Sequence, residues 1–196
     1  MSASGSTRWH HERVSSDYDP SVILYRRARL GLDEAKTAAW RQSAGSVHAR
    51  AEEVDEVVLT VVLVHAALET AWHWATRSLS TQEKGRWPRD WNKTLLTAAT
   101  KRGVSSVAAP DDLGAALLEL GALRNFLQHG DDQARKKLAG MLPDFSVPES
   151  LNFAFADQVV KNADRLFQRF ADMAGGEAVG PDHSGWTPDP YRAWGD

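Results

Sequence analysis

The feature that most constrains the fold is a helical repeat of apolar side chains between Ala49 and Leu79. Over these roughly thirty residues the apolar positions recur at alternating steps of three and four, with His65 in the one gap; they are Val54, Val58, Val61, Leu68, Trp72, Ala75 and Leu79. β-branched pairs such as Val57-Val58 also suit a strand, but the length and the period favour a helix. A stripe this long predicts a helix that packs against others in a bundle.

Signals for helix ends predict further helices on both sides of this one. Pro20, with Asp19 as its N-cap, opens a helix that runs toward Trp40, and Gly31 predicts a kink or break in it. After a loop containing glycine and proline, a shorter helix is expected over residues 91–101.

Three more helices are expected in the C-terminal half. Asp111 or Asp112 caps a long helix that ends at His129, where the next residue, a glycine, provides the C-cap. Residues 131–141 predict a short helix and residues 151–173 the last long one, with apolar side chains along one side.

No segment has a convincing strand pattern, and no internal repeat is visible. The predicted fold class is therefore all-α, an antiparallel bundle of four to five main helices over residues 20–174. Residues 1–19 are polar and predict a disordered arm, whereas residues 175–196 contain several glycines, prolines and aromatics and predict an extended tail.

The composition limits the classes of function. A chain of 196 residues with 42% hydrophobic residues can form one domain with a real core. A net charge of -3 argues against strong nonspecific binding to nucleic acid, although a local cationic cleft needs no basic chain around it. The absence of cysteine excludes disulfides and Cys-based zinc sites. With no long apolar stretch and a polar N-terminus, a soluble cytoplasmic protein without membrane contact is expected.

The most informative motif is Arg124-Asn125-Phe126-Leu127-Gln128-His129-Gly130. An always-charged planar guanidinium near an imidazole that titrates close to neutral pH suits chemistry on a phosphodiester. On a helix, Arg124 continues a leucine row, and Asn125 and His129 lie about 140° around the axis, one turn apart, so that Asn125 can orient the imidazole. The arginine can curl toward His129 near the helix end, or the two groups can meet their counterparts across a two-fold axis. The alternative is a buried ion-paired arginine and a histidine that only interacts with the helix dipole.

The pattern R-x-x-x-x-H, here R-N-x-x-x-H-G, resembles the signature of the HEPN superfamily (higher eukaryotes and prokaryotes nucleotide-binding). The resemblance implies a bundle of four or five helices that dimerises, so that two motifs line one composite cleft. It implies that Arg124 and His129 are catalytic, with Asn125 in support, in an RNA-cutting reaction that needs no metal or cofactor. The 2′-hydroxyl would attack the adjacent phosphorus, which leaves a 2′,3′-cyclic phosphate and a 5′-hydroxyl.

The same resemblance implies a biological setting and partners. HEPN domains occur in toxin–antitoxin and antiphage systems, so RNA, a second copy of the chain and a cognate antitoxin or defence-complex protein are the expected partners. A subset of these toxins carries a tyrosine two positions after the histidine, which the antitoxin modifies. Asp131 occupies that position here, so inhibition by that route is not expected. Glu69, in the long helix that precedes the motif, is a candidate to pair with Arg124.

Substrate contacts outside the motif are expected from two basic segments. Arg135 and Lys136 directly follow the motif and can bind RNA phosphates, although a solvated helix face explains them equally well. Trp87 and Trp91 flank a loop with two arginines and can stack on bases. The alternative for this loop is that both tryptophans pack inward.

A metal site is the weaker interpretation of another cluster. His65, Glu69 and His73 are spaced four residues apart and so share a helix face, as ligands of zinc or iron would. The H-E-x-x-H pattern is absent and His65 belongs to the apolar stripe, so a core histidine and no metal are expected.

The sequence therefore leaves two functional hypotheses. The first is a metal-independent endoribonuclease, and the alternative is a non-catalytic HEPN-like bundle that binds a nucleotide or a protein partner.

Overall fold

The computed structural model describes residues 20–105 and 111–174, and this part of the chain is entirely helical in its regular structure. It contains six helices, α1 (Pro20–Ser43), α2 (Ala49–Ala75), α3 (Trp91–Lys101), α4 (Asp111–His129), α5 (Asp132–Met141) and α6 (Phe153–Met173). The predicted all-α class is confirmed. The predicted arm and tail lie outside the described residues.

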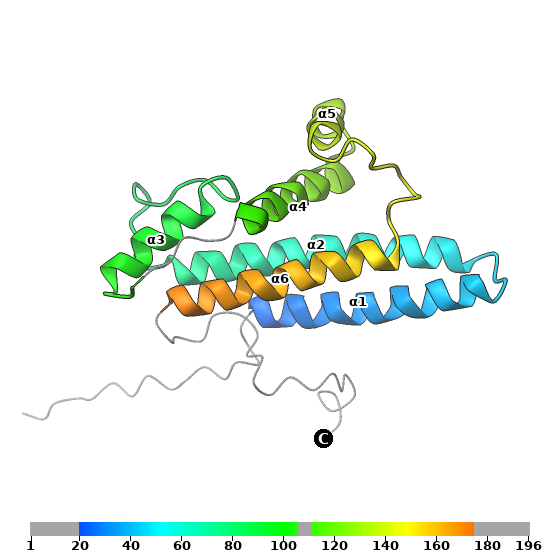
Figure 1. The fold of residues 1–196 in the computed structure, drawn as a ribbon, viewed down its shortest axis with the longest axis horizontal. Helices are drawn as coiled ribbons and strands as arrows, with labels where there is room; N and C mark the ends of the chain where they lie inside the picture. The colour runs from blue at the N-terminus through cyan, green and yellow to red at the C-terminus, as the bar shows by residue number, and fades with distance from the viewer. Residues whose placement is uncertain (1–19, 106–110, 175–196) are drawn as a thin grey trace, which may run out of the picture.

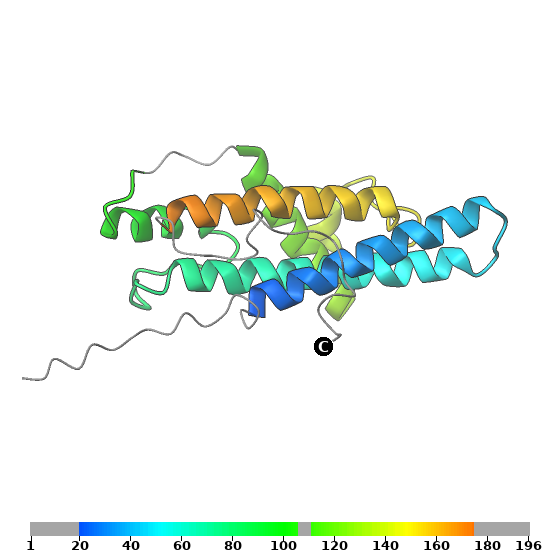
Figure 2. The same ribbon diagram turned by 90° about the horizontal axis from the view of Figure 1, so that it is seen from below.

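Four long helices form the body of the molecule. Figure 1 shows α2 and α6 side by side at its centre, with α1 on one side of them and α4 on the other. α1 and α4 run opposite to α2 and α6, as both views of the ribbon show (Figures 1 and 2). The short helix α5 packs on the outer end of α4. Even so, the last residues of α4, Gln128 and His129, are exposed to solvent.

The core lies where α1, α2 and α6 meet, and large side chains fill it. Tyr25, Trp72, Phe167 and Phe170 are each at most 1% exposed. The indole N–H of Trp72 donates to the Trp91 carbonyl oxygen at 3.1 Å, so the polar atom of the largest core side chain has a partner. This contact also joins the start of α3 to α2.

The break expected at Gly31 does not occur, because α1 continues through this residue. A Cβ at this position would lie only 2.6 Å from Thr60 Oγ1 on α2. The same hydroxyl donates to the Ala28 carbonyl oxygen at 3.2 Å. The glycine thus allows two helices to approach closely, and apolar spacing within one helix does not reveal this.

Capping side chains explain where the C-terminal helices begin. Asp131 Oδ1 accepts the backbone N–H of Ala134 at 2.7 Å, and Asn152 Oδ1 accepts that of Phe155 at 3.0 Å. α6 therefore begins at Phe153, two residues later than expected. α2 ends at Ala75, before the expected Leu79, although Leu79 is still buried.

None of the described helices is both long enough and apolar enough to span a bilayer.

Candidate functional site

The motif lies at the C-terminal end of α4. Gly130 has φ of +61°, and its N–H donates to the Phe126 carbonyl oxygen at 2.8 Å. This left-handed conformation favours glycine and ends the helix, as the sequence predicted. The last turn of α4 carries His129, whose side chain is exposed to solvent.

Arg124 is half-buried, and a neutral amide holds its guanidinium. Nη1 donates to Asn125 Oδ1 at 3.0 Å. Across residues 20–105 and 111–174, none of the ion pairs involves Arg124. The alternative interpretation, in which Arg124 is half of a buried ion pair, therefore lacks its carboxylate partner among the described residues. A partly desolvated guanidinium without a counterion favours an anionic ligand.

Asn125 acts on Arg124 and not on His129. The expected hydrogen bond between Asn125 and the imidazole is not formed in the described part of the chain; the amide oxygen accepts from the guanidinium of Arg124. Arg124 and His129 leave the helix about 140° apart around its axis. One copy of the chain thus presents the two groups on different sides of α4.

His65 lies directly behind the motif helix. It is 5% exposed, and burial, together with the positive charge of Arg124, lowers its pKa from 6.5 to about 4. Its Nε2 atom lies 3.7 Å from the position that a Cβ on Gly121 would take. The neutral imidazole is therefore a core group under α4, as expected for a histidine on the apolar stripe.

Glu69 contacts His65 and forms no ion pair with Arg124 in the described residues. Its Oε2 atom lies 3.9 Å from His65 Nδ1, and the carboxylate is 40% exposed. The expected pairing of Glu69 with Arg124 is thus not present in the single copy.

His73, the third member of the possible metal cluster, is exposed. The described residues contain no group of three ligands that could hold a metal.

The tryptophans of the loop between α2 and α3 pack inward. Trp91 is 4% exposed, so its ring presents no face on which a base could stack in this structure. Trp87 is half-buried, with its ring centroid 5.3 Å from that of Trp72 and 6.5 Å from that of Phe170. Hydrophobic packing against the core, which sequence spacing in a loop cannot reveal, accounts for both positions.

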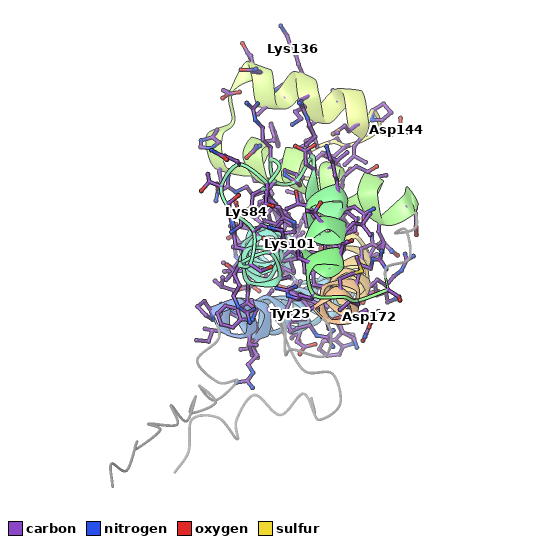
Figure 3. The ribbon with its side chains drawn as sticks, turned by 90° about the vertical axis from the view of Figure 1, so that its left-hand side faces the viewer. Tyr25, Lys84, Lys101, Lys136, Asp144 and Asp172 are labelled. Atoms are coloured by element: carbon purple, nitrogen blue, oxygen red, sulfur yellow. The ribbon has the colours of Figure 1, made fainter. Side chains whose placement is uncertain are left out.

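The basic residues that follow the motif are exposed on α5. Arg135 and Lys136 both face solvent, while Leu138 is buried and attaches the helix to the bundle. Figure 3 shows Lys136 projecting from α5, on the side of the molecule opposite Tyr25 of α1. Both cations remain candidates for contacts with a polyanion.

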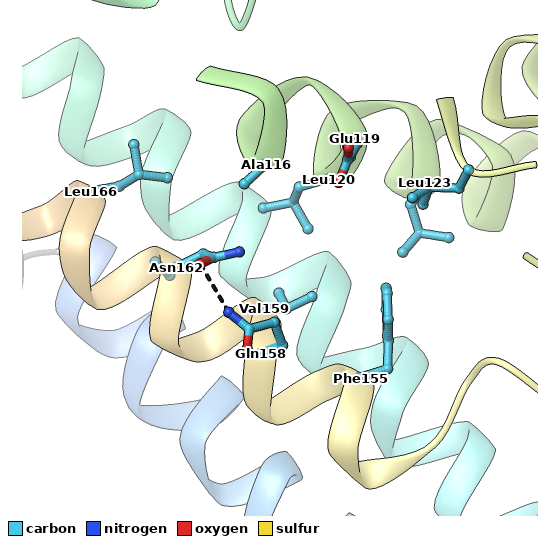
Figure 4. A pocket seen from close by; sticks show the side chains of 11 residues that line it. Ala116, Glu119, Leu120, Leu123, Phe155, Gln158, Val159, Asn162 and Leu166 are labelled. Carbon is cyan, nitrogen blue, oxygen red and sulfur yellow. Dashed lines mark hydrogen bonds between the residues drawn. The ribbon is translucent and has the colours of Figure 1, made fainter. Parts of the chain in front are cut away.

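A cavity of about 90 Å³ lies between α4 and α6, and Leu123, the residue before the motif, belongs to its lining (Figure 4). Its walls are mainly apolar, and Gln158 and Asn162, hydrogen-bonded at 3.1 Å, lie on one side of it. Ligand pockets usually measure roughly 300 Å³ or more, so this cavity is too small for a nucleotide. It shares no residue with the motif and is not the candidate site.

The contact that sequence reasoning missed is at Gly121, one turn before Arg124. A Cβ there would lie 3.1 Å from Pro88 Cγ, so the loop between α2 and α3 packs directly on the motif helix. A glycine within a helix rich in alanine and leucine was the available signal.

Comparison of the chain with protein-family models, with curated proteins and with solved structures found no match.

Proposed function

We propose that this protein is a metal-independent endoribonuclease of the HEPN type that acts as a homodimer. The observation that carries the proposal is the half-buried guanidinium of Arg124, which has no carboxylate partner in the described residues and lies five positions before an exposed histidine. A cation in this state suits a phosphate, and a histidine that solvent and substrate can reach suits proton transfer.

In the proposed reaction, His129 removes the proton of an RNA 2′-hydroxyl. The 2′-oxygen forms a bond to the adjacent phosphorus while the bond from phosphorus to the 5′-oxygen breaks. The leaving oxygen takes a proton and becomes a 5′-hydroxyl, and the other product carries a 2′,3′-cyclic phosphate. Arg124 stabilises the negative charge that develops on the phosphorus oxygens. Asn125 positions Arg124 through the hydrogen bond of 3.0 Å.

The directions of the two side chains support the proposed homodimer. Groups about 140° apart on one helix do not readily reach the same phosphate. Two copies of α4 related by a two-fold axis bring the Arg124 of one copy near the His129 of the other. Phe126 and Leu127, near the helix end, pack against the core but stay partly exposed, so their outer surfaces can contribute to such an interface.

The resemblance also supports a biological role as the effector of a toxin–antitoxin or antiphage system. RNA is then the substrate, and a cognate antitoxin or defence-complex protein is the inhibitory partner. Because Asp131 caps α5 in place of a modifiable tyrosine, the inhibitor would act by binding.

The test is incubation of the purified protein with end-labelled single-stranded RNA in excess EDTA. The wild type should cleave it and leave cyclic-phosphate ends, while His129→Ala and Arg124→Ala should each lose roughly 100-fold or more in rate. His48→Ala provides a matched control, because His48 is also exposed, at the N-terminal end of α2, and its side chain makes no capping hydrogen bond.

Two results would contradict the proposal. If folded wild type and His129→Ala release identical fragments, the cleavage comes from a contaminant. If cleavage requires added metal and stops in EDTA, the metal-free mechanism is wrong. Growth arrest on expression that depends on both Arg124 and His129 would support the toxin role.

A further inference from the structure

We propose that the loop between α2 and α3 binds the sugar-phosphate backbone of single-stranded RNA through Arg86 and Arg89, beside the motif at the end of α4. The inference rests on the proposed ribonuclease function and adds a substrate-binding surface to it. This surface, called the arginine loop below, comprises residues 85–90.

The arginine loop has an inner and an outer side. Trp87 packs on Trp72 with ring centroids 5.3 Å apart, and Pro88 packs on the backbone of Gly121. Arg86 and Arg89, on either side of this pair, are exposed to solvent. The aromatic part of the segment therefore anchors the loop and leaves the two guanidinium groups outside.

Hydrogen bonds hold the loop backbone in place before any ligand binds. The Arg86 N–H donates to Asp90 Oδ2 at 2.8 Å, and the Asp90 N–H donates back to the Arg86 carbonyl oxygen at 2.7 Å. The Gly85 N–H donates to Thr94 Oγ1 at 2.9 Å, which ties the loop to α3. Because the backbone is ordered in advance, binding loses less conformational entropy.

Two contacts place the loop beside the motif. Pro88 lies against Gly121, and Arg124 follows one turn later on the same face of α4, about 4.5 Å further along the axis. His65 provides the second link, because its ring lies 6.1 Å from that of Trp87 and the charge of Arg124 acts on it. The arginine loop and the proposed phosphate site are thus neighbours in space.

The charges on the loop are available to a ligand. Within the described residues, none of the ion pairs involves Arg86 or Arg89. Asp90, the nearby acid, accepts the backbone N–H of Arg86. Arginine presents a planar set of donors that matches phosphate oxygens. Lys84, the residue directly before the loop, lies on the end of the molecule that faces the viewer in Figure 3.

An RNA strand fits these observations better than an acidic protein. The chain has a net charge of -3, so exposed arginines beside Arg124 are a local feature and not the result of a basic composition. A strand whose reacting phosphate is bound by Arg124 has further phosphates on both sides, and the arginine loop lies next to that position. Each bound phosphate releases counterions, which makes the affinity depend on salt.

The experiment measures binding separately from cleavage. A fluorescent single-stranded RNA with 2′-O-methyl groups has no nucleophilic hydroxyl, so its anisotropy reports binding alone. The Arg86→Ala/Arg89→Ala double variant should bind it roughly ten-fold more weakly, and the slope of log affinity against log salt should fall by about 1.4 for two phosphates lost. Arg27→Ala/Lys36→Ala removes two exposed charges from α1, on the opposite side of the bundle, and should bind within about two-fold of wild type.

The outcomes separate this inference from the proposed function. If the wild type cleaves natural RNA and the loop variant binds and cleaves as the wild type does, the loop proposal is overturned while the function is supported. If the wild type binds through the loop but never cleaves, the surface is supported and the ribonuclease is not. If polyglutamate of equal charge competes as strongly as RNA, the surface recognises acidic proteins and the RNA proposal is wrong. Thermal melting of the loop variant at the wild-type temperature confirms that it is folded.

Discussion

Arg124 leaves α4 in a row of leucines, and in the described residues its guanidinium donates to a neutral amide and forms no ion pair. Leu113, Leu117 and Leu120 of this row are buried, which makes the position unfavourable for a cation that has no anion. An arginine with a purely structural role would be expected to have a carboxylate partner. The hydrogen bond from Arg124 to Asn125 leaves the positive charge in place and fixes the direction of the guanidinium.

This arrangement predicts that Asn125→Asp slows RNA cleavage without unfolding the protein. The new carboxylate would form an ion pair with Arg124 and compete with the RNA phosphate. We expect kcat/KM for cleavage to fall by roughly ten-fold or more, which corresponds to about 1.4 kcal/mol of transition-state binding. Gln128→Glu is the matched control, because it makes the same amide-to-acid change at an exposed position of the same turn. Equal losses in the two variants would show that only the overall charge matters.

His65 predicts a dependence of stability on pH. Its pKa is lowered from 6.5 to about 4 in the folded chain, first by burial and then by Arg124. Between these values the unfolded chain binds the proton and the folded chain does not, so stability is lost as the pH falls from 6.5 toward 4. The loss is at most about 3 kcal/mol, since a ten-fold difference in proton affinity between the two states corresponds to about 1.4 kcal/mol.

Urea denaturation at pH 7, 5.5 and 4.5 measures this effect. His65→Gln should be less stable at pH 7, because a buried site is disturbed, but its stability should fall less steeply with acid. His73→Gln, at an exposed position of the same helix, should retain the wild-type slope. A wild-type slope in His65→Gln would mean that His65 is not the group responsible.

At the scale of the elements, the sequence predicted helix ends that depend on residues of the same helix. It missed close contacts that depend on another part of the fold. Local signals gave the bounds of α3 and the C-terminal end of α4, where Gly130 acts within one turn of its own helix. The start of α4 was predicted less well, because Asp111 lies inside the helix and not before it as its N-cap. Gly31 lies close to Thr60 of α2, and Gly121 lies close to Pro88 of the loop before α3. The apolar period along one helix cannot predict either contact. The inward packing of Trp91 depends on the bundle core for the same reason.

The candidate site, too, could be predicted from the sequence only in part. The motif indicated Arg124 and His129 as candidate residues, and helical geometry determined their angular separation around the axis of α4. The hydrogen bond of Asn125 to Arg124 depends on which rotamer the surroundings allow, and the position of the arginine loop depends on how α2, α3 and α4 pack. Both required the structure.

The close contact at Gly31 gives a prediction for the α1–α2 pair. Gly31→Ala should destabilise the protein by about 1–3 kcal/mol, because the added Cβ lies 2.6 Å from Thr60 Oγ1 and the packed helices must move apart. Gly114→Ala, also within a helix, meets no atom closer than 3.9 Å and should stabilise by up to about 1 kcal/mol through helix propensity. Thermal or urea unfolding compares the two variants.

Thr60→Ala removes the oxygen that the new Cβ would meet. If the contact is the cause, the Gly31→Ala/Thr60→Ala double variant will lose less stability than the sum of the two single changes. Strict additivity would locate the cost elsewhere.

At the scale of the whole molecule, the candidate residues gather on one side of the bundle. α1 lies on one side of the central helices, and α4, α5 and the proposed motif lie on the other (Figure 1). The candidate residues Arg124, His129, Arg135 and Lys136 all belong to α4 and α5, and Arg86 and Arg89 belong to the loop that packs on α4. A second copy that binds this side would face the motif and the basic residues together.

Mixing two inactive variants tests whether the active site is shared between two copies. In a dimer of Arg124→Ala with His129→Ala, one chain retains the arginine and the other the histidine. If the reacting pair is formed between copies, each mixed dimer has one of its two pairs intact. An equal mixture in which half of the dimers are mixed should then recover about a quarter of the wild-type activity. A pair within one chain would recover nothing, because each chain lacks one of its two groups.

Each variant alone at the same total concentration is the control, and mass spectrometry of the intact complexes verifies that mixed dimers form. Because the two side chains leave α4 about 140° apart, we expect recovery. Mixed dimers that form but do not cleave would contradict the shared site and require that Arg124 bends around the helix end to reach His129 of its own chain.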